Sequence, residues 1–436
     1  MILIKQKEAL IRNGASPAHR KLMLDCLEHT ANSLLPDVLL KGKLSFVGKT
    51  LIVEKEKFEI GGKIFVIGAG KAGGTMAETI EKIIPVEKGI VSLPRGTING
   101  FSCKKIELIE AGHPYPDEGS MRAAKEMISL SKEVREEDLL ICLISGGGSS
   151  LLALPDEGIS MEEKSAIVKA VMNAGANIEE LNSVRKSLSA IKGGKLAMHF
   201  KKAKIVNIIL SDVLENSIST VASGPTVLDR YAYAHAKDIL KKYGFWDQEK
   251  NYCKVIERGI MVGRLPLTLE KSQPEIDDFV IGDNALAVKI ASSYLERNGY
   301  AVEKYFNVTG TARDRGREFA LILNRGKCFV AGGETTVKVK ANGIGGRNQE
   351  FAMGAAQFLK KGTLVSMGTD GIDGISNAAG AIVDNETKEK AKRKGLSIPE
   401  YLEYNDSNHF FEEIGDGLIV TGPSGTNVCD LMIGLV

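Results

Sequence analysis

The sequence is poor in the residues that mark several common protein classes. Its 436 residues include only 6 cysteines, 6 histidines and 1 tryptophan, and no two cysteines form a CxxC pair. This excludes a disulfide framework and the usual zinc sites, so we expect free, buried thiols in a reducing compartment. The formal net charge is only +2, which provides no charge excess for binding nucleic acid or an anionic membrane.

Long hydrophobic segments and several enzyme signatures are also missing. No apolar run approaches the roughly 18 residues needed to cross a bilayer, and the first residues lack the apolar region of a signal peptide. We therefore expect a cytoplasmic protein. The sequence contains no Walker A motif, no HRD or DFG kinase signature and no GxSxG of the α/β-hydrolases.

Glycine, by contrast, is abundant. There are 47 glycines, against an average share of roughly 7%. With only 12 prolines and no Gly-X-Y period, the chain is neither collagen-like nor a Pro/Gly-rich disordered protein. The glycines are therefore expected in tight turns or where the backbone approaches a ligand.

Short apolar runs alternate with helical periodicities along most of the chain. The runs lack polar–apolar alternation, which predicts strands buried on both faces of a parallel sheet; they span 63–70, 139–148, 205–212, 278–283, 327–334 and 363–371. The pattern predicts an α/β fold, in which ligands bind beyond the carboxyl ends of the strands. Residues 244–277 interrupt this alternation of strands and helices, so we place the boundary between two domains at 250. The first domain then spans 1–250, with the N-terminal helices packed on it, and the second spans 251–436.

A GxGxxG sequence that contains Gly68, Gly70 and Lys71 follows the first of these runs and precedes a predicted helix. This arrangement suits a phosphate at a helix N-terminus. However, the next predicted strand ends in Pro94 and Arg95, where an NAD site needs an acid for the ribose. A solvated lysine in an ordinary turn explains the local sequence equally well.

A second loop carries three glycines between serines. Consecutive backbone N–H groups in such a loop bind anionic oxygens, and hydroxyl groups add donors or a ligand for Mg²⁺. A sterically demanding turn is the alternative, but a turn rarely needs all of these residues together. We therefore predict an anion site formed by Ser145, Gly146, Gly147, Gly148, Ser149 and Ser150.

A basic segment follows, for which we predict a helix over 182–193. Arg185 and Lys192 would share one face of this helix, where they could clamp a carboxylate or a phosphate. A solvated basic face is the other interpretation of the same pattern.

Acids and one arginine occupy other strand ends and turns. Asp212, Glu334 and Asp370 end predicted strands and could hold Mg²⁺, which needs few direct protein ligands, or could cap helices. Arg347 and Asn348 follow a glycine turn and begin a predicted helix. From there the arginine could stabilise charge on a transferring phosphoryl group.

Taken in order, these motifs resemble the glycerate kinase family of the tartrate-utilisation and MOFRL type. The matching segments cover most of the chain from residue 61 onward and include VIGAGKAGGTMA, AGHPYPD, ISGGGSSLLALP, NSVRKSLSAIKGGKLA, LSDVLENSISTVASGPTV, GGETTVKVKANGIGGRNQE and GTDGIDGISNAAGAIVD. The resemblance implies a larger Rossmann-like domain with a mostly parallel sheet and a smaller α/β domain with a mixed sheet. It also implies an active-site cleft between them.

The same resemblance implies a reaction and the residues that serve it. ATP would phosphorylate D-glycerate at its 2-hydroxyl, giving 2-phosphoglycerate and ADP, with Mg²⁺ or another divalent cation as cofactor. Lys71 and Arg347 would be the catalytic pair. From the residues themselves, and not from the resemblance, we add that Asp212 or Asp370 could take the hydroxyl proton or hold the metal. The partners would be small molecules, without nucleic acid or membrane, and a homodimer is the expected assembly.

Two other functions remain open from the sequence. The first is an NAD(P)-dependent oxidoreductase acting on a small hydroxy acid, which the GxGxxG loop would suit. The second is a non-enzymatic protein that binds a nucleotide or metabolite. Titration with NAD(P)H against ATP separates the first of these from a kinase.

Overall fold

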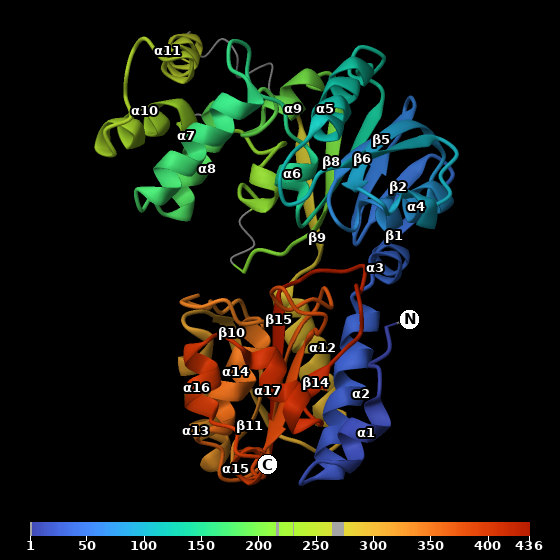
Figure 1. Cartoon of the computed structure of the whole chain (residues 1–436). Coiled ribbons are helices and arrows are strands. Elements are labelled where there is room, and N and C mark those ends of the chain that lie inside the picture. The colour runs from blue at the N-terminus through green and yellow to red at the C-terminus, as the bar shows by residue number, and fades with distance from the viewer. Residues whose placement is uncertain (1, 215–217, 230, 264–273) are drawn as a thin grey trace. The chain divides into compact units, whose positions relative to one another are not determined.

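The computed structural model describes residues 2–214, 218–229, 231–263 and 274–436 (Figure 1). The chain divides into two compact units, and each is described by itself. The parallel-sheet unit comprises Leu40–Ser211 and Asn216–Ile281. The mixed-sheet unit comprises Met1–Leu39, Asp212–Glu215 and Gly282–Val436.

This division differs from the boundary expected at residue 250. The parallel-sheet unit extends to Ile281, and residues 1–39 belong to the unit that contains the C-terminus. A buried ion pair explains the second difference, because Arg20 Nη2 lies 2.7 Å from Asp384 Oδ2 and neither side chain is exposed. Helical periodicity shows that a segment is a helix but does not show which sheet it covers. Residues 264–273, which belong to the segment 244–277, lie outside the described residues.

The parallel-sheet unit is built on strands with the order β6-β5-β4-β7-β8-β9. The neighbours from β6 to β8 pair in parallel, and β4 and β7 are buried along their whole length. In chain order this is the 3-2-1-4-5-6 arrangement of Rossmann folds, so the predicted α/β class is confirmed. The strands are β4 (Ile64–Ala69), β5 (Val86–Pro94), β6 (Ile106–Ala111), β7 (Leu139–Ser145), β8 (Lys204–Leu210) and β9 (Ile276–Gly282).

Helices and a small antiparallel meander complete this unit. The meander is β1 (Leu44–Val47), β2 (Thr50–Val53) and β3 (Glu56–Glu59). A helical group with its own hydrophobic core contains α7 (Met161–Asn173), α8 (Ile178–Ser187), α10 (Ala232–Lys242) and α11 (Asn251–Gly263). The remaining helices are α3 (Pro36–Lys43), which leads into the unit, α4 (Gly73–Ile83), η1 (Ile98–Gly100), α5 (Glu118–Leu130), α6 (Gly148–Leu151), α9 (Lys195–His199) and η2 (Val221–Ser223).

The mixed-sheet unit has the strand order β10-β11-β15-β12-β13-β14, in which β10 and β11 are parallel and the other pairs antiparallel. The C-terminal strand β15 thus lies in the interior of the sheet, which the sequence analysis did not predict. The strands are β10 (Val302–Val308), β11 (Cys328–Gly333), β12 (Thr363–Gly368), β13 (Gly380–Asp384), β14 (Leu418–Ile419) and β15 (Asp430–Leu435).

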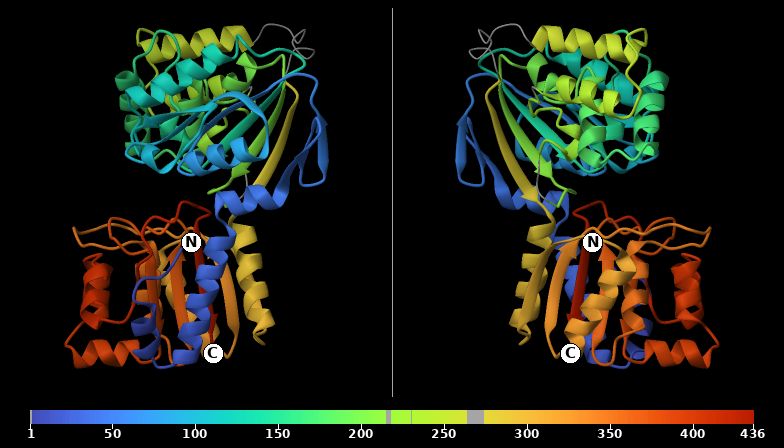
Figure 2. Two further views of the ribbon diagram at one scale, coloured as in Figure 1. Left: turned by 90° about the vertical axis from the view of Figure 1, so that its right-hand side faces the viewer. Right: turned by 90° about the vertical axis from the view of Figure 1, so that its left-hand side faces the viewer.

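Helices flank the mixed sheet, and α2 packs beside α12 (Figure 2). Phe319, Phe329 and Phe351 stack in the core. The helices are α1 (Lys7–Arg12), α2 (Pro17–Ser33), α12 (Asn284–Arg297), α13 (Ala312–Asn324), α14 (Arg347–Ala356), α15 (Thr387–Arg393), α16 (Ile398–Glu403) and α17 (Ser407–Ile414). Within the described residues, no helix has the length and apolar character required to span a bilayer.

Candidate active site

Two glycine loops meet at the carboxyl ends of β4 and β7. The strand order changes direction between these two adjacent strands. The strands that follow β4 in the chain, β5 and β6, lie on one side, and those that follow β7, β8 and β9, lie on the other. Ligands of open α/β sheets bind at this switch point. Gly68 lies near the end of β4 and Ser145 ends β7, so the structure places both predicted loops there.

Hydrogen bonds tie the two loops together. The backbone N–H of Lys71 donates to the carbonyl of Gly146 at 2.8 Å, and that of Ala72 donates to Ser145 Oγ at 3.2 Å. Gly70 has φ of +151°, and a Cβ added there would lie 1.9 Å from Ser145 Oγ. A side chain at Gly70 would therefore separate the loops.

Residues 145–150, called the glycine nest below, present backbone donors at this point. Gly147 adopts a left-handed conformation and caps the short helix α6. The N–H groups of Ser150 and Leu151 turn back to the carbonyl of Gly147. Within the described residues, the N–H groups of Gly147, Gly148 and Ser149 have no hydrogen-bond acceptor. Such unsatisfied donors fit the oxygens of a phosphate or carboxylate.

Two exposed basic side chains border the nest. A Cβ added to Gly147 would lie 3.0 Å from the Cδ2 and Nε2 atoms of His113 and 3.2 Å from Lys71 Cγ. Lys71 and His113 are both exposed. Lys71 was predicted, whereas His113 was missed. Its signal in the sequence was the segment AGHPYPD, which served only to support the family resemblance.

The basic segment folds differently from the prediction. Helix α8 begins at Ile178, because Asn177 and Glu180 form a capping box, and ends at Ser187. The predicted helix is confirmed over 182–187, but its bounds of 182 and 193 are wrong. Lys192 lies in a turn before Gly193 and Gly194, both at positive φ. Arg185 and Lys192 consequently do not share a helix face.

Lys192 nevertheless contacts the nest from behind. Its Nζ donates to the carbonyl of Ser149 at 2.5 Å. Burial, and next the charge of Arg185, lower the pKa of Lys192 to about 7. Lys164 was missed by the sequence analysis; its side chain is buried and its Nζ has no partner among the described residues. This lysine looks like any other in the helical pattern of α7, so the sequence gives no signal for it.

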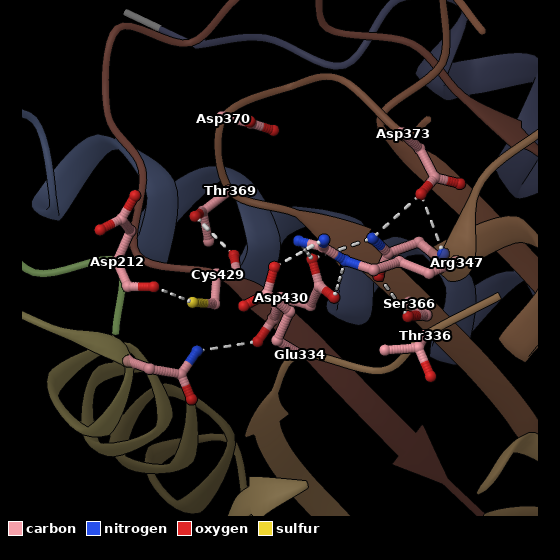
Figure 3. A network of polar contacts seen from close by, with 12 residues as sticks. Asp212, Glu334, Thr336, Arg347, Ser366, Thr369, Asp370, Asp373, Cys429 and Asp430 are labelled. Carbon is pink, nitrogen blue, oxygen red and sulfur yellow. Dashed lines mark hydrogen bonds and ion pairs between the residues drawn. The ribbon is translucent and has the colours of Figure 1, made fainter. Parts of the chain in front are cut away.

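In the mixed-sheet unit, Arg347 is held by two carboxylates (Figure 3). Its Nε and Nη2 donate to Asp430 Oδ2 and Oδ1 at 2.6 and 3.0 Å, and its Nη1 donates to Glu334 Oε1 at 2.8 Å. Burial alone would lower the pKa of Arg347, but the negative charge of Asp430 and its hydrogen bonds raise it above its usual value. Burial raises the pKa of Asp430, and the Arg347 guanidinium counters that shift.

Asp430 is fully buried at the start of β15 and was missed by the sequence analysis. Asn348 joins it to the start of α14, because Asn348 Nδ2 donates to Asp430 Oδ1 at 3.0 Å and Ser366 Oγ donates to Asn348 Oδ1 at 2.6 Å. These bonds fix the first turn of α14, which carries Arg347. No local motif marks an aspartate that becomes important only through a strand pairing.

Asp373 caps the same helix. It accepts hydrogen bonds from the backbone and side-chain nitrogens of both Asn348 and Gln349, at 2.9 to 3.3 Å. Burial raises the pKa of Asp373 to about 6, although these donors oppose the shift. The capping of α14 by Asp373 is a finding of the structure, because no separate role for this residue was predicted from the sequence.

The predicted acids Asp212 and Asp370 also lie in the mixed-sheet unit. The carbonyl oxygen of Asp212 accepts a hydrogen bond from Cys429 Sγ at 2.9 Å (Figure 3). Asp370 Oδ1 accepts one from the backbone of Ile372 at 3.1 Å. Among the described residues no group of three or more His, Cys, Asp or Glu side chains could hold a metal ion. Any Mg²⁺ at this site would therefore need most of its ligands from water and phosphate, as Mg²⁺ commonly does.

A Rossmann-ordered sheet with unsatisfied amide donors and a lysine at its switch point defines an α/β protein that binds phosphate-bearing or carboxylate-bearing small molecules. Comparison with known proteins narrows this class. A domain family of unknown function (DUF4147) matches residues 22–257, and the MOFRL family matches residues 327–430. The chain belongs to the glycerate kinase family.

Three relatives illustrate the match. A glycerate 2-kinase of Pyrococcus horikoshii is 40% identical over 88% of this chain and 90% of its own. A crystal structure of glycerate kinase from Thermotoga maritima superposes with a TM-score of 0.83 at 34% identity, covering 95% of this chain and 99% of that one. A putative hydroxypyruvate reductase of Agrobacterium vitis is 36% identical over 86% of this chain and 87% of its own.

Proposed function

We propose that this protein transfers the γ-phosphoryl group of ATP to the 2-hydroxyl of D-glycerate, giving 2-phosphoglycerate and ADP. The observation that carries the proposal is the glycine nest, whose free N–H groups lie beside Lys71 at the switch point of a Rossmann sheet. Both substrates are anionic, so such a site fits them. The glycerate kinases among the relatives support the same reaction.

Each predicted residue receives a role in this reaction. The nest, with Gly68 and Gly70, binds a phosphate of ATP or the glycerate carboxylate. Arg185 adds positive charge near it, and Lys192 does so when it is protonated. Lys71 and Arg347 stabilise the negative charge that develops as the phosphoryl group transfers. Asn348 positions Arg347 by bonding its partner Asp430.

Further assignments belong to this proposal. Asp212 and Asp370 hold Mg²⁺ or take the hydroxyl proton, and Glu334 contacts the substrates. Mg²⁺, when bound with ATP, neutralises phosphate charge. The protein works in the cytoplasm and assembles as a homodimer.

A coupled assay tests the function. With ATP, Mg²⁺ and D-glycerate, we expect a product that enolase consumes directly, as 2-phosphoglycerate does. A product that enolase consumes only after phosphoglycerate mutase is added would show transfer to the 3-hydroxyl. Oxidation of NADH by hydroxypyruvate, without any ATP-dependent turnover of glycerate, would support the oxidoreductase instead. That alternative is not favoured, because Lys71 lies in the GxGxxG loop and β5 ends in Pro94 without the acid that an NAD site needs.

A further inference from the structure

Phosphoryl transfer to a hydroxyl needs a group that takes the hydroxyl proton. With a phosphate of ATP on the glycine nest, which is one of the two occupants proposed above, this group must lie near the nest and Lys71. The nest and Lys71 both belong to the parallel-sheet unit.

His113 lies at this place. It follows β6, and its Cδ2–Nε2 edge packs against Gly147, on the side where Lys71 Cγ also approaches. The imidazole is exposed, and among the described residues no hydrogen bond acts on its pKa. A ligand bound to the nest could therefore reach it without displacing another group.

The other charged groups near His113 are already engaged. Asp117 forms an ion pair with Arg95 and caps α5 through the backbone N–H of Ser120. Glu110 accepts hydrogen bonds from the backbone of Gly96 at 2.8 Å and of Ile98 at 3.2 Å. Both carboxylate oxygens of Asp117 and the Oε1 of Glu110 are therefore already used as acceptors.

We propose that His113 is a further catalytic residue and acts as the general base of the transfer. The hydroxyl oxygen of the acceptor forms a bond to the γ-phosphorus, and its proton passes to the imidazole. The bond between the γ-phosphorus and the bridging oxygen breaks, and its electron pair stays on ADP. The imidazolium then returns the proton to water. This inference rests on the proposed function and leaves Asp212 and Asp370 as metal ligands.

The protonation state agrees with this role. Burial, and next the positive charge of Lys71, lower the pKa of His113 from its usual 6.5. The imidazole is therefore neutral near pH 7 and can accept a proton. Because the protonated form cannot, activity should fall as the pH drops through the pKa of His113.

The test compares His113→Gln with His113→Ala, since glutamine keeps an N–H donor but cannot accept a proton at neutral pH. If His113 is the base, both variants lose about 10²-fold in kcat with little change in KM, on the scale of general base catalysis. Both also lose the acidic limb of the pH–rate profile. If His113 only donates a hydrogen bond, the glutamine variant keeps its activity, which overturns the proposal.

His235→Gln is the matched control, because His235 is an exposed histidine of the same unit that stacks on Tyr231. It should retain wild-type kcat and pH dependence. Thermal unfolding of all the variants shows whether they fold. Failure of the wild-type protein to phosphorylate glycerate refutes the proposed function, whereas normal turnover by a folded His113→Gln variant refutes only this inference.

Discussion

The two units hold their positive charge in different ways. In the parallel-sheet unit, Lys71 is exposed beside backbone donors that have no acceptor among the described residues. In the mixed-sheet unit, Arg347 already donates to Asp430 and Glu334. The first arrangement is ready to receive an anion, whereas the second fixes the orientation of a guanidinium. Substitutions at the nest and Lys71 should therefore act mainly on ligand binding and catalysis, whereas substitutions in the Arg347 network should also lower the stability of the fold.

The largest effect is expected from Lys71→Ala and Arg347→Ala. Each should lower kcat/KM by about 10²-fold or more, because each removes a charge that stabilises the transferring phosphoryl group. Arg347→Ala should also lower the free energy of unfolding, by about 3 kcal/mol, since it leaves the buried Asp430 without its counter-charge. Steady-state kinetics and chemical denaturation measure the two effects.

Lys82→Ala is the control for Lys71, because the exposed Lys82 side chain forms an ion pair with Glu78 on the same helix, α4. It should change neither activity nor stability. Turnover of Lys71→Ala within about threefold of wild type would remove Lys71 from the catalytic pair.

The next effect concerns stability within the Arg347 network. Asp430→Asn should lower the free energy of unfolding by about 2 kcal/mol, because it removes a fully buried charge partner. Glu334→Gln should cost less than about 1 kcal/mol, since the Glu334 side chain is 45% exposed. Urea denaturation measures both values. Equal losses of unfolding free energy in the two variants would show that the burial of Asp430 does not make its ion pair more important for stability than that of Glu334.

The smallest effect is expected at a glycine of the nest. Gly147 and Gly175 both have positive φ, +80° and +93°, but a Cβ meets His113 and Lys71 only at Gly147. Both alanine variants should lose about 1 kcal/mol of stability through backbone strain. Only Gly147→Ala should also lose activity, by about tenfold, and equal kinetics for the two variants would argue against a site at the nest.

Much of this architecture follows from the sequence because it depends on local patterns. Buried strands such as β4 and β7 show as continuous apolar runs, and the glycine loops at their ends mark the switch point. Lys71 and the nest were found in this way. The predicted start of the basic helix was wrong because Asn177, rather than Asn182, forms the capping box.

The features that the sequence did not reveal depend on contacts between distant segments. Asp430 becomes the partner of Arg347 only because β15 inserts between β11 and β12. Arg20 assigns the N-terminal helices to the mixed-sheet unit through an ion pair with Asp384. His113 approaches Gly147 only when β6 and β7 have taken their places in one sheet. No local motif records such distances.

The central claim is that the open donors beside Lys71 bind ATP. Titration calorimetry of the wild-type protein and of Lys71→Ala with a non-hydrolysable β,γ-imido analogue of ATP tests it most directly, with NADH as the competing ligand. We expect the wild-type protein to bind the analogue, Lys71→Ala to bind it at least about tenfold more weakly, as the loss of a charge-assisted contact predicts, and NADH to give no binding heat. Binding of NADH without binding of the analogue, or equal affinity in the two proteins, would contradict the account.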